Sequence, residues 1–430
     1  MVLLYLHRAR SFHSFTVSFS TFVNKSTCSA SPTKPLMHVS AIFVLGATLN
    51  ELSSIAPRLA ELVERAEREP AALADELAAF SVQTIMQPLT PLPECQGSCQ
   101  GCGMCCQNGV QMPTSQCFDD PTAKFCCPAG CQTPTCVKPP PAPSRVPSGG
   151  LPIVVAHGMG DSCFNSGMKS ITKEAGEHMG VYSTCIPTGD DRIKDTINGF
   201  LLNMDKSVDV FAAAVKADPK LAGGFNAFGL SQGNQLIRGY IQKYNSPPVN
   251  AYLSICGINA GVAAFPQCNP DTPVIGNVCA ALTEVLGDLA YYPVVQEHLF
   301  QANYFRDPTH VHNDTKYLLN SQLAQWNGEG VRNMTADKAN FGKTAKLVWI
   351  RGTEDTVVWP NQGEQWGQLS AEYPANKSVV PMPQATWYTS DAFGLKTADL
   401  AGRNYFEQFR GQHIRFTTEE LFGWLDKYFV

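Results

Sequence analysis

A serine with glycines at both second neighbours stands at the end of a largely apolar stretch. The residues are Gly229, Ser231 and Gly233; the run 225–228 precedes them, and apolar residues at helical spacing follow over 235–244. This pattern predicts a buried strand, a tight turn and a helix, with glycine needed where the two elements cross closely. A serine at the strained apex of such a turn suits a nucleophile that attacks an acyl carbonyl. Because the motif is short, its meaning depends on the rest of the chain.

An acid and a histidine follow this serine in an informative order. Asp355 comes directly after the apolar run 345–352, which predicts a strand, and His413 lies on a loop before a terminal helix expected over 417–428. In the α/β-hydrolase fold, the chain order is serine, acid, histidine, and each residue lies at a strand end or on an adjoining loop. Ser231, Asp355 and His413 are therefore predicted to form a catalytic triad.

A glycine-containing loop after an earlier strand is expected to complete the site. The apolar run 151–156 predicts a central strand of a parallel sheet and continues into 157–162, which contains two glycines. In an enzyme with a serine at such a turn, this loop supplies one of the two backbone N–H groups that hold the developing oxyanion. We assign His157 a structural role, because the catalytic histidine of this architecture comes last in the chain.

The helices and strands that carry these residues alternate over 151–430. This rhythm predicts an α/β-hydrolase fold with a central, mostly parallel sheet. The alternation fails between about 258 and 343, which we interpret as an inserted cap region that covers the substrate entrance. Two N-glycosylation sequons, at Asn313 and Asn333, fall in this insertion.

Composition restricts the class of protein. The chain has 430 residues, a formal net charge of -5 and 44 % apolar residues, without a dense basic run. It is long enough for a sizeable core and at least one further domain. Because there is no positively charged footprint, nucleic acid is not an expected partner.

The N-terminal third divides into several expected segments. Residues 1–36 contain no acidic residue and are interpreted as an extension of the gene model, while the apolar run behind Met37 predicts a signal peptide over 37–56. A buried helix is the alternative for that run, which is too short to span a bilayer. Helical spacing over 57–94, interrupted by Pro70, predicts two short helices of a pro-segment or spacer.

A cysteine-rich module is expected over 95–137. Ten of the sixteen cysteines lie between Cys95 and Cys136, in a stretch with too few apolar residues for a core of its own. Zinc is the alternative, because Cys99, Cys102 and Cys105 have ligand-like spacing. The even count, two vicinal pairs and the lack of histidine favour disulfides, so no metal or other cofactor is predicted. The proline-rich residues 138–150 are interpreted as a linker and domain boundary.

Motifs distributed over residues 151–430 resemble those of the palmitoyl-protein thioesterase family. They are His157–Ser162, Asp218–Leu221, Gly229–Gly233, Ser246–Pro248, Tyr291, Val294–Glu297, Asp307–Pro308, Tyr388 and Gly394–Lys396. The resemblance is specific because the motifs fall in order across the whole domain. It excludes residues 1–150.

This resemblance implies roles for particular residues. Ser231 would be the nucleophile, with Asp355 and His413 as its partners, and the backbone N–H groups of Met159 and Gln232 would form the oxyanion hole. It further implies a disulfide between Cys268 and Cys279 and glycosylation near Asn313 and Asn333. The chain departs from the family where a vicinal cysteine pair is Cys163–Phe164 here, and where cysteines expected near Phe211 and Tyr244 are absent, so two family bridges cannot form.

The expected activity is cleavage of long-chain acyl thioesters, such as S-palmitoyl groups on cysteine of proteins or peptides, through an acyl-enzyme. Met159, Val357 and Val358 are predicted to line an acyl groove together with the insertion, because the valines directly follow Asp355 and Met159 lies in the oxyanion loop. The alternative is that both valines belong to the core. The triad does not distinguish thioesters from oxygen esters, so a secreted lipase or esterase is the alternative. A second alternative is a non-catalytic secreted protein whose cysteine-rich module binds carbohydrate or protein. The expected signal peptide and the resemblance to a lysosomal enzyme family together indicate the secretory pathway, ending in a lysosome or vacuole or outside the cell. No stable membrane span is expected, because the apolar run is too short.

Overall fold

The computed structural model describes residues 57–85, 104–107, 110–113, 150–264, 286, 289–311, 314–373 and 375–430. The predicted segments 1–36 and 37–56 lie outside these residues, as do the predicted linker 138–150 apart from its last residue, Cys268, Cys279 and Asn313. Among the described residues, no helix is long and apolar enough to cross a membrane.

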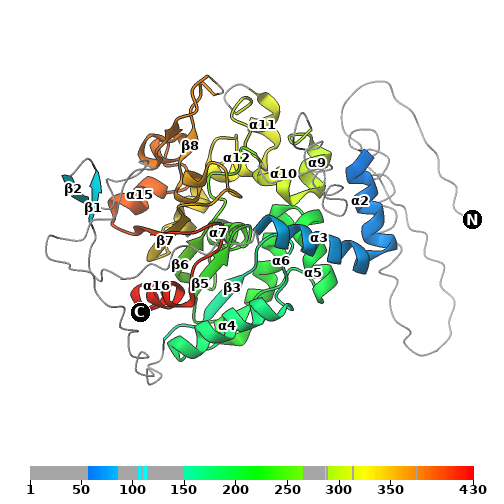
Figure 1. Cartoon of the computed structure of the whole chain (residues 1–430), viewed down its shortest axis with the longest axis horizontal. Coiled ribbons are helices and arrows are strands. Elements are labelled where there is room, and N and C mark those ends of the chain that lie inside the picture. Colours follow the sequence, from blue (N-terminus) through cyan, green and yellow to red (C-terminus); the bar gives the residue numbers. More distant parts are fainter. Residues whose placement is uncertain are drawn as a thin grey trace, which may run out of the picture. The chain divides into compact units, whose positions relative to one another are not determined.

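The centre of the chain is a six-stranded sheet in which every neighbouring pair is parallel (Figure 1). Its strands, in spatial order, are β10 (Asn404–Phe409), β7 (Lys346–Gly352), β6 (Val249–Ile255), β5 (Phe225–Leu230), β3 (Ile153–Ala156) and β4 (Ser183–Cys185). The predicted α/β-hydrolase fold with a mostly parallel sheet is thus confirmed.

Helices cover both faces of this sheet, which explains why β3 and β5 are buried over their whole length. On one face, Phe228 and Leu253 join a core that includes Met168 and Trp424 of two helices. These helices are α4 (Ser166–Met179) and α16 (Thr418–Tyr428). On the other face lie α6 (Met204–Ala217), α7 (Gly233–Lys243) and α13 (Thr335–Phe341), and Tyr240 of α7 packs on Phe225.

Short helices fill the interval interpreted as an insertion and the region after β7. They are α9 (Pro293–His298), α10 (Phe300–Tyr304), α11 (Thr315–Asn320), α12 (Gln322–Asn327), η3 (Asn361–Gln365), η4 (Met382–Gln384), α14 (Thr386–Thr389) and α15 (Leu395–Leu400). A two-stranded sheet of β8 (Gln368–Leu369) and β9 (Val379–Val380) lies between η3 and η4 in the chain. Helix α5 (Arg192–Leu201) precedes α6 in the chain, and η2 (Pro219–Leu221) follows it.

The segment after residue 56 forms two helices, α2 (Pro57–Arg68) and α3 (Pro70–Ile85). The break between them lies at Pro70, where an interruption was predicted. Proline is well tolerated in the first turn of a helix, where its missing N–H has no partner to lose. Helix α3 packs on α5, and Asp75 forms an ion pair with Arg192 at 2.9 Å. In the cysteine-rich segment predicted to form a disulfide module, β1 (Met104–Gln107) and β2 (Val110–Pro113) pair as antiparallel strands.

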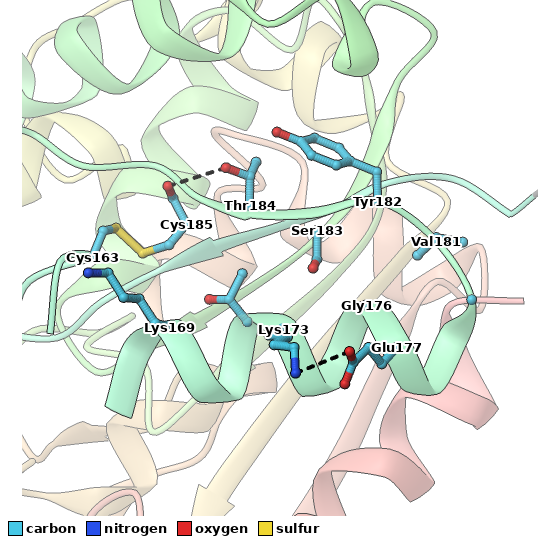
Figure 2. Close-up of a pocket in the computed structure, with 12 residues that line it drawn as sticks. Cys163, Lys169, Lys173, Gly176, Glu177, Val181, Tyr182, Ser183, Thr184 and Cys185 are labelled. Atoms are coloured by element: carbon cyan, nitrogen blue, oxygen red, sulfur yellow. Dashed lines mark hydrogen bonds and ion pairs between the residues drawn. A yellow bond between two sulfur atoms is a disulfide. The ribbon is translucent and has the colours of Figure 1, made fainter. Parts of the chain in front are cut away.

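A disulfide joins Cys163, in the loop after β3, to Cys185 at the end of β4 (Figure 2). Cys163 lacks the vicinal cysteine of the family, and its pairing with Cys185 was not predicted from the sequence. The bridge borders a cleft of about 720 Å³ between α4 and β4, where Lys169 and Tyr182 are among the lining residues. The disulfide ties the glycine-containing loop after β3 to β4, the edge strand of the sheet.

Candidate active site

The turn between β5 and α7 places Ser231 at its apex. Its φ is 53°, in the left-handed region that residues other than glycine rarely adopt. A Cβ added at Gly229 would lie 2.5 Å from the side chain of Asn234, and one at Gly233 would lie 2.4 Å from the carbonyl oxygen of Ala156. Glycine is therefore required at both positions, because the strand, the helix and the β3 end approach too closely for any side chain.

Three segments far apart in the sequence bring Ser231, His413 and Asp355 into one hydrogen-bonded line. The Nε2 atom of His413 lies 2.8 Å from Ser231 Oγ, and its Nδ1 lies 2.5 Å from Asp355 Oδ2. All three residues are buried. With Nδ1–H donating to the carboxylate, Nε2 is left to accept the serine proton, which is the arrangement that activates a serine as a nucleophile.

The carboxylate of Asp355 is held by backbone as well as by His413. Its Oδ1 accepts hydrogen bonds from the N–H groups of Val357 at 2.7 Å and Val358 at 3.0 Å. Burial alone would raise the pKa of Asp355. The charge of His413 and its hydrogen bond to the carboxylate lower this pKa, as does the smaller contribution of the Val358 N–H, and the net shift is downward. Asp355 is therefore ionised at neutral pH and able to stabilise a protonated His413.

The same two valines were predicted to line an acyl groove. The side chain of Val358 is 1 % exposed, whereas Val357 is half-buried. Their backbone contacts with Asp355 were not anticipated, because a sequence pattern does not show which N–H groups a carboxylate will meet. Contact of Met159, Val357 and Val358 with an acyl chain stays a prediction.

The loop after β3 lies against the serine. A Cβ added at Gly158 would be 3.4 Å from Ser231 Cβ, so Met159 is next to a residue in van der Waals reach of the nucleophile. Met159 and Gln232 are both buried, and Tyr304 contacts both: its hydroxyl donates to Gln232 Oε1 at 3.0 Å and lies 3.8 Å from Met159 Sδ. Of the two residues predicted to form the oxyanion hole, Gln232 follows Ser231 directly and Met159 follows Gly158, and both contact Tyr304.

A buried amide network holds the Gln232 side chain. Its Nε2 donates to the carbonyl oxygen of Gly199 at 2.7 Å, and Gln301 Nε2 donates to Gln232 Oε1 at 3.0 Å and to Gly199 at 2.9 Å. Gln301 and Tyr304 belong to α10, inside the interval interpreted as an insertion. Sequence reasoning missed both residues, because no motif or periodicity links α10 to the serine turn.

His157 lies in a separate buried cluster, which agrees with the structural role assigned to it from the sequence. Its Nε2 lies 3.2 Å from Asp195 Oδ1, and its Nδ1 donates to the carbonyl oxygen of Gly158 at 2.9 Å. Asp195 also accepts from Ser162 Oγ and the Cys163 N–H, both at 2.9 Å. This cluster fixes the loop that carries Met159 and takes no part in the line from Ser231 to Asp355.

Two groups of possible metal ligands occur in the described part of the chain. One contains Cys163, whose sulfur is committed to the disulfide. The other combines Cys256 with Asp355 and His413. Both ring nitrogens of His413 already have hydrogen-bond partners. Burial raises the pKa of the Cys256 thiol well above its ordinary value, so Cys256 is a neutral thiol and a poor metal ligand. The donor set suits acyl transfer better than metal binding.

Together, the fold and this arrangement define a hydrolase of the α/β-hydrolase class. A model of the palmitoyl protein thioesterase family matches residues 152–413, which include Ser231, Asp355 and His413. The chain belongs to this family and is a thioester-cleaving hydrolase.

Curated relatives agree with this membership. Palmitoyl-protein thioesterase 1 of Caenorhabditis elegans is 31 % identical over 283 residues, which cover 65 % of this chain and 92 % of the relative. Palmitoyl-protein thioesterase 3 of Dictyostelium discoideum is 35 % identical over 204 residues, covering 47 % and 66 %. Lysosomal thioesterase PPT2 of Mus musculus is 28 % identical over 267 residues, covering 60 % and 80 %.

Proposed function

We propose that this enzyme removes long-chain fatty acyl groups from cysteine residues of proteins or peptides, with Ser231 as nucleophile, His413 as general base and Asp355 as the residue that orients it. The observation that carries this proposal is the continuous hydrogen-bonded line from Ser231 Oγ through His413 to Asp355. The names of the relatives, palmitoyl-protein thioesterases 1 and 3, support the choice of substrate.

The chemistry follows from the geometry. His413 Nε2 takes the proton of Ser231 as Oγ attacks the thioester carbonyl, and Asp355 stabilises the imidazolium. When the tetrahedral intermediate collapses, the carbon–sulfur bond breaks and His413 gives the proton to the leaving thiolate. A water molecule then attacks the acyl-enzyme, with His413 accepting its proton. The bond between the acyl carbon and Ser231 Oγ breaks, His413 returns the proton to Oγ, and the fatty acid leaves.

The developing oxyanion is assigned to the backbone N–H groups of Met159 and Gln232. Gly158 lies against Ser231, and Gln232 is the first residue after it, as expected for donors that flank a nucleophile. Each such donor typically contributes about 2.7–4 kcal/mol in the transition state. Met159 and Val357 are proposed to flank the acyl chain; because Val358 is 1 % exposed, a chain reaches it only after neighbouring side chains move.

A secretory route that ends in a lysosome or vacuole, or outside the cell, is proposed for the enzyme. Disulfides such as Cys163–Cys185 persist in oxidising compartments, and Asn333 of a glycosylation sequon is exposed. A relative is named a lysosomal thioesterase. For the segment 95–137, a carbohydrate or protein partner is proposed on the strength of its cysteine density alone.

Wild type and Ser231→Ala, assayed with a palmitoyl-cysteine peptide and with a p-nitrophenyl ester, test the proposed function. The wild type should hydrolyse the thioester, and the variant should lose more than about 10³-fold in kcat for both substrates. A folded variant that keeps a tenth of the activity would refute Ser231 as nucleophile. A wild type that cleaves only the oxygen ester would contradict the substrate assignment while leaving the triad intact.

A further inference from the structure

A second carboxyl group is buried beside the triad and takes no part in the proton transfers described above. Glu364 of η3 is 0 % exposed, and its Oε2 accepts a hydrogen bond from the Gly352 N–H at 3.1 Å. Its Oε1 has no donor among the described residues. A fully buried carboxylate with one unsatisfied oxygen would be costly, because burial of an ion is tolerated only with strong compensation.

The neighbour of Glu364 is Asp355. Both residues meet at Gly352: its N–H donates to Glu364, its carbonyl oxygen accepts from the Asp355 N–H at 3.1 Å, and a Cβ added to it would lie 3.5 Å from Asp355 Cβ. A hydrogen bond between the two carboxyl groups requires a proton on one of them. Asp355 already accepts from the N–H groups of Val357 and Val358 and from His413, and these donors favour its ionised form. The shared proton therefore belongs to Glu364.

The other groups that face Glu364 leave this assignment unchanged. Burial raises the pKa of Glu364 well above its ordinary value, and the charge of Asp355 raises it further. Arg351 on β7 favours the ionised form, but its influence is smaller than these two. Cys256 lies close enough to interact with both acids and is itself neutral because burial raises its pKa.

We propose that Glu364 is a positioning residue of the active site: a neutral carboxylic acid that donates a hydrogen bond to Asp355 and holds this carboxylate toward His413. The proposal rests on the assignment of Ser231, His413 and Asp355 as the triad. Glu364 acts through Asp355 and does not touch the substrate. As pH rises, loss of its proton would place two negative charges side by side in a buried site, so kcat should fall on the alkaline side.

Three variants separate this role from simple packing. In Glu364→Gln, the amide N–H donates to Asp355 and the carbonyl oxygen accepts from Gly352, so kcat should stay within about threefold of wild type, and the alkaline fall should move to higher pH. Glu364→Leu lacks the donor and should lose about tenfold or more in kcat with little change in KM. Glu354→Gln is the matched control, because Glu354 is partly exposed and pairs with Arg410 on the surface; its pH profile should equal that of wild type.

Thermal unfolding gives a readout that does not depend on activity. A carboxyl group with a raised pKa in the folded state releases its proton on unfolding, so it lowers stability progressively as pH rises above 4.5, its value in the unfolded chain. Glu364→Gln removes this linkage, so the Tm difference between this variant and wild type should grow from pH 4.5 toward neutral pH. The wild type should also show an infrared band of a protonated carboxyl group at neutral pH that Glu364→Gln lacks.

A Tm difference independent of pH, or an equal loss of kcat in Glu364→Gln and Glu364→Leu, would overturn the proposal. If Glu364→Leu does not fold, the comparison of Glu364→Gln with wild type still decides. Failure of the triad itself would appear instead as activity retained by Ser231→Ala, with the Tm and infrared results unaffected.

Discussion

Tyr304 donates its hydroxyl proton to the side-chain oxygen of Gln232 at 3.0 Å, although 72 residues separate them in the chain. The same hydroxyl lies 3.8 Å from Met159 Sδ. One residue of α10 therefore contacts both residues whose backbone N–H groups are proposed to hold the oxyanion. Because oxyanion donors act mainly in the transition state, a neighbour that fixes their position should affect turnover more than substrate binding.

Tyr304→Phe should lower kcat by about fivefold with little change in KM, because one hydrogen bond of about 1 kcal/mol that orients Gln232 is lost. Steady-state kinetics with a palmitoyl thioester measure this. Tyr182→Phe is the matched control: it also removes one hydroxyl, from a residue that bonds Asp218, and should leave kcat unchanged. Equal kinetics of wild type and Tyr304→Phe would show that Tyr304 does not support the oxyanion site.

Replacing both Cys163 and Cys185 by serine should destabilise the enzyme. The bridge closes a loop with a sequence separation of 22 residues, and the chain-entropy model gives about 3 kcal/mol for a loop of this size. Urea unfolding should show a lower midpoint for the double variant. Each single variant should lose a similar amount, since either substitution opens the same loop. An unchanged midpoint would indicate that the bridge does not form.

The buried pair of His157 and Asp195 predicts a pH-dependent stability. Burial alone lowers the pKa of His157, but Asp195 raises it overall; burial alone raises the pKa of Asp195, but His157 lowers it overall. The contribution of His157 is complete below 6.5, its value in the unfolded chain, and disappears as pH rises through the folded value. The contribution of Asp195 is present above 3.8 and is lost as pH falls through its folded value.

Asp195→Asn should therefore cost about 3 kcal/mol of unfolding free energy near pH 5 and distinctly less near pH 8. Chemical denaturation at both values measures the difference. Asp205→Asn is the control: this half-buried carboxylate in the first turn of α6 accepts from the indole N–H of Trp326 and does not contact His157, so its cost at the same two pH values gives the reference. A cost of Asp195→Asn that is equal at both pH values would contradict a charged His157.

The parts of the site that the sequence predicted are those fixed by local geometry and chain order. Gly229 and Gly233 mark a crossing that only glycine permits, so the pattern around Ser231 already specifies a turn. Asp355 was assigned because it follows the strand expected over 345–352, and His413 because it comes last in the chain order, on a loop before the expected terminal helix. The strand β10 that precedes His413 was not predicted.

The parts that the sequence did not predict depend on tertiary proximity alone. Tyr304 and Gln301 reach Gln232 from a five-residue helix, and nothing in that helix repeats with a period that aims it at the turn. Cys163 and Cys185 pair because their Cα atoms lie 5.5 Å apart, a distance that spacing along the chain does not reveal. Glu364 is an ordinary charged residue in sequence, and only its complete burial beside Asp355 shows otherwise.

The acyl groove is best tested at Val357, because this side chain is half-buried, whereas a polar replacement of Val358 would disrupt the core before it reported on substrate. Each chain methylene that contacts protein contributes about 0.8 kcal/mol. Val357→Asn should therefore lower kcat/KM for a palmitoyl thioester about tenfold more than for an acetyl thioester, since contact with about two methylenes is lost. Thr356→Ala, at an exposed neighbouring position, should affect the two substrates equally. If Val357→Asn lowered kcat/KM for the palmitoyl and the acetyl thioester by the same factor, Val357 would lie outside the acyl groove. The loss would then come from its backbone N–H contact with Asp355.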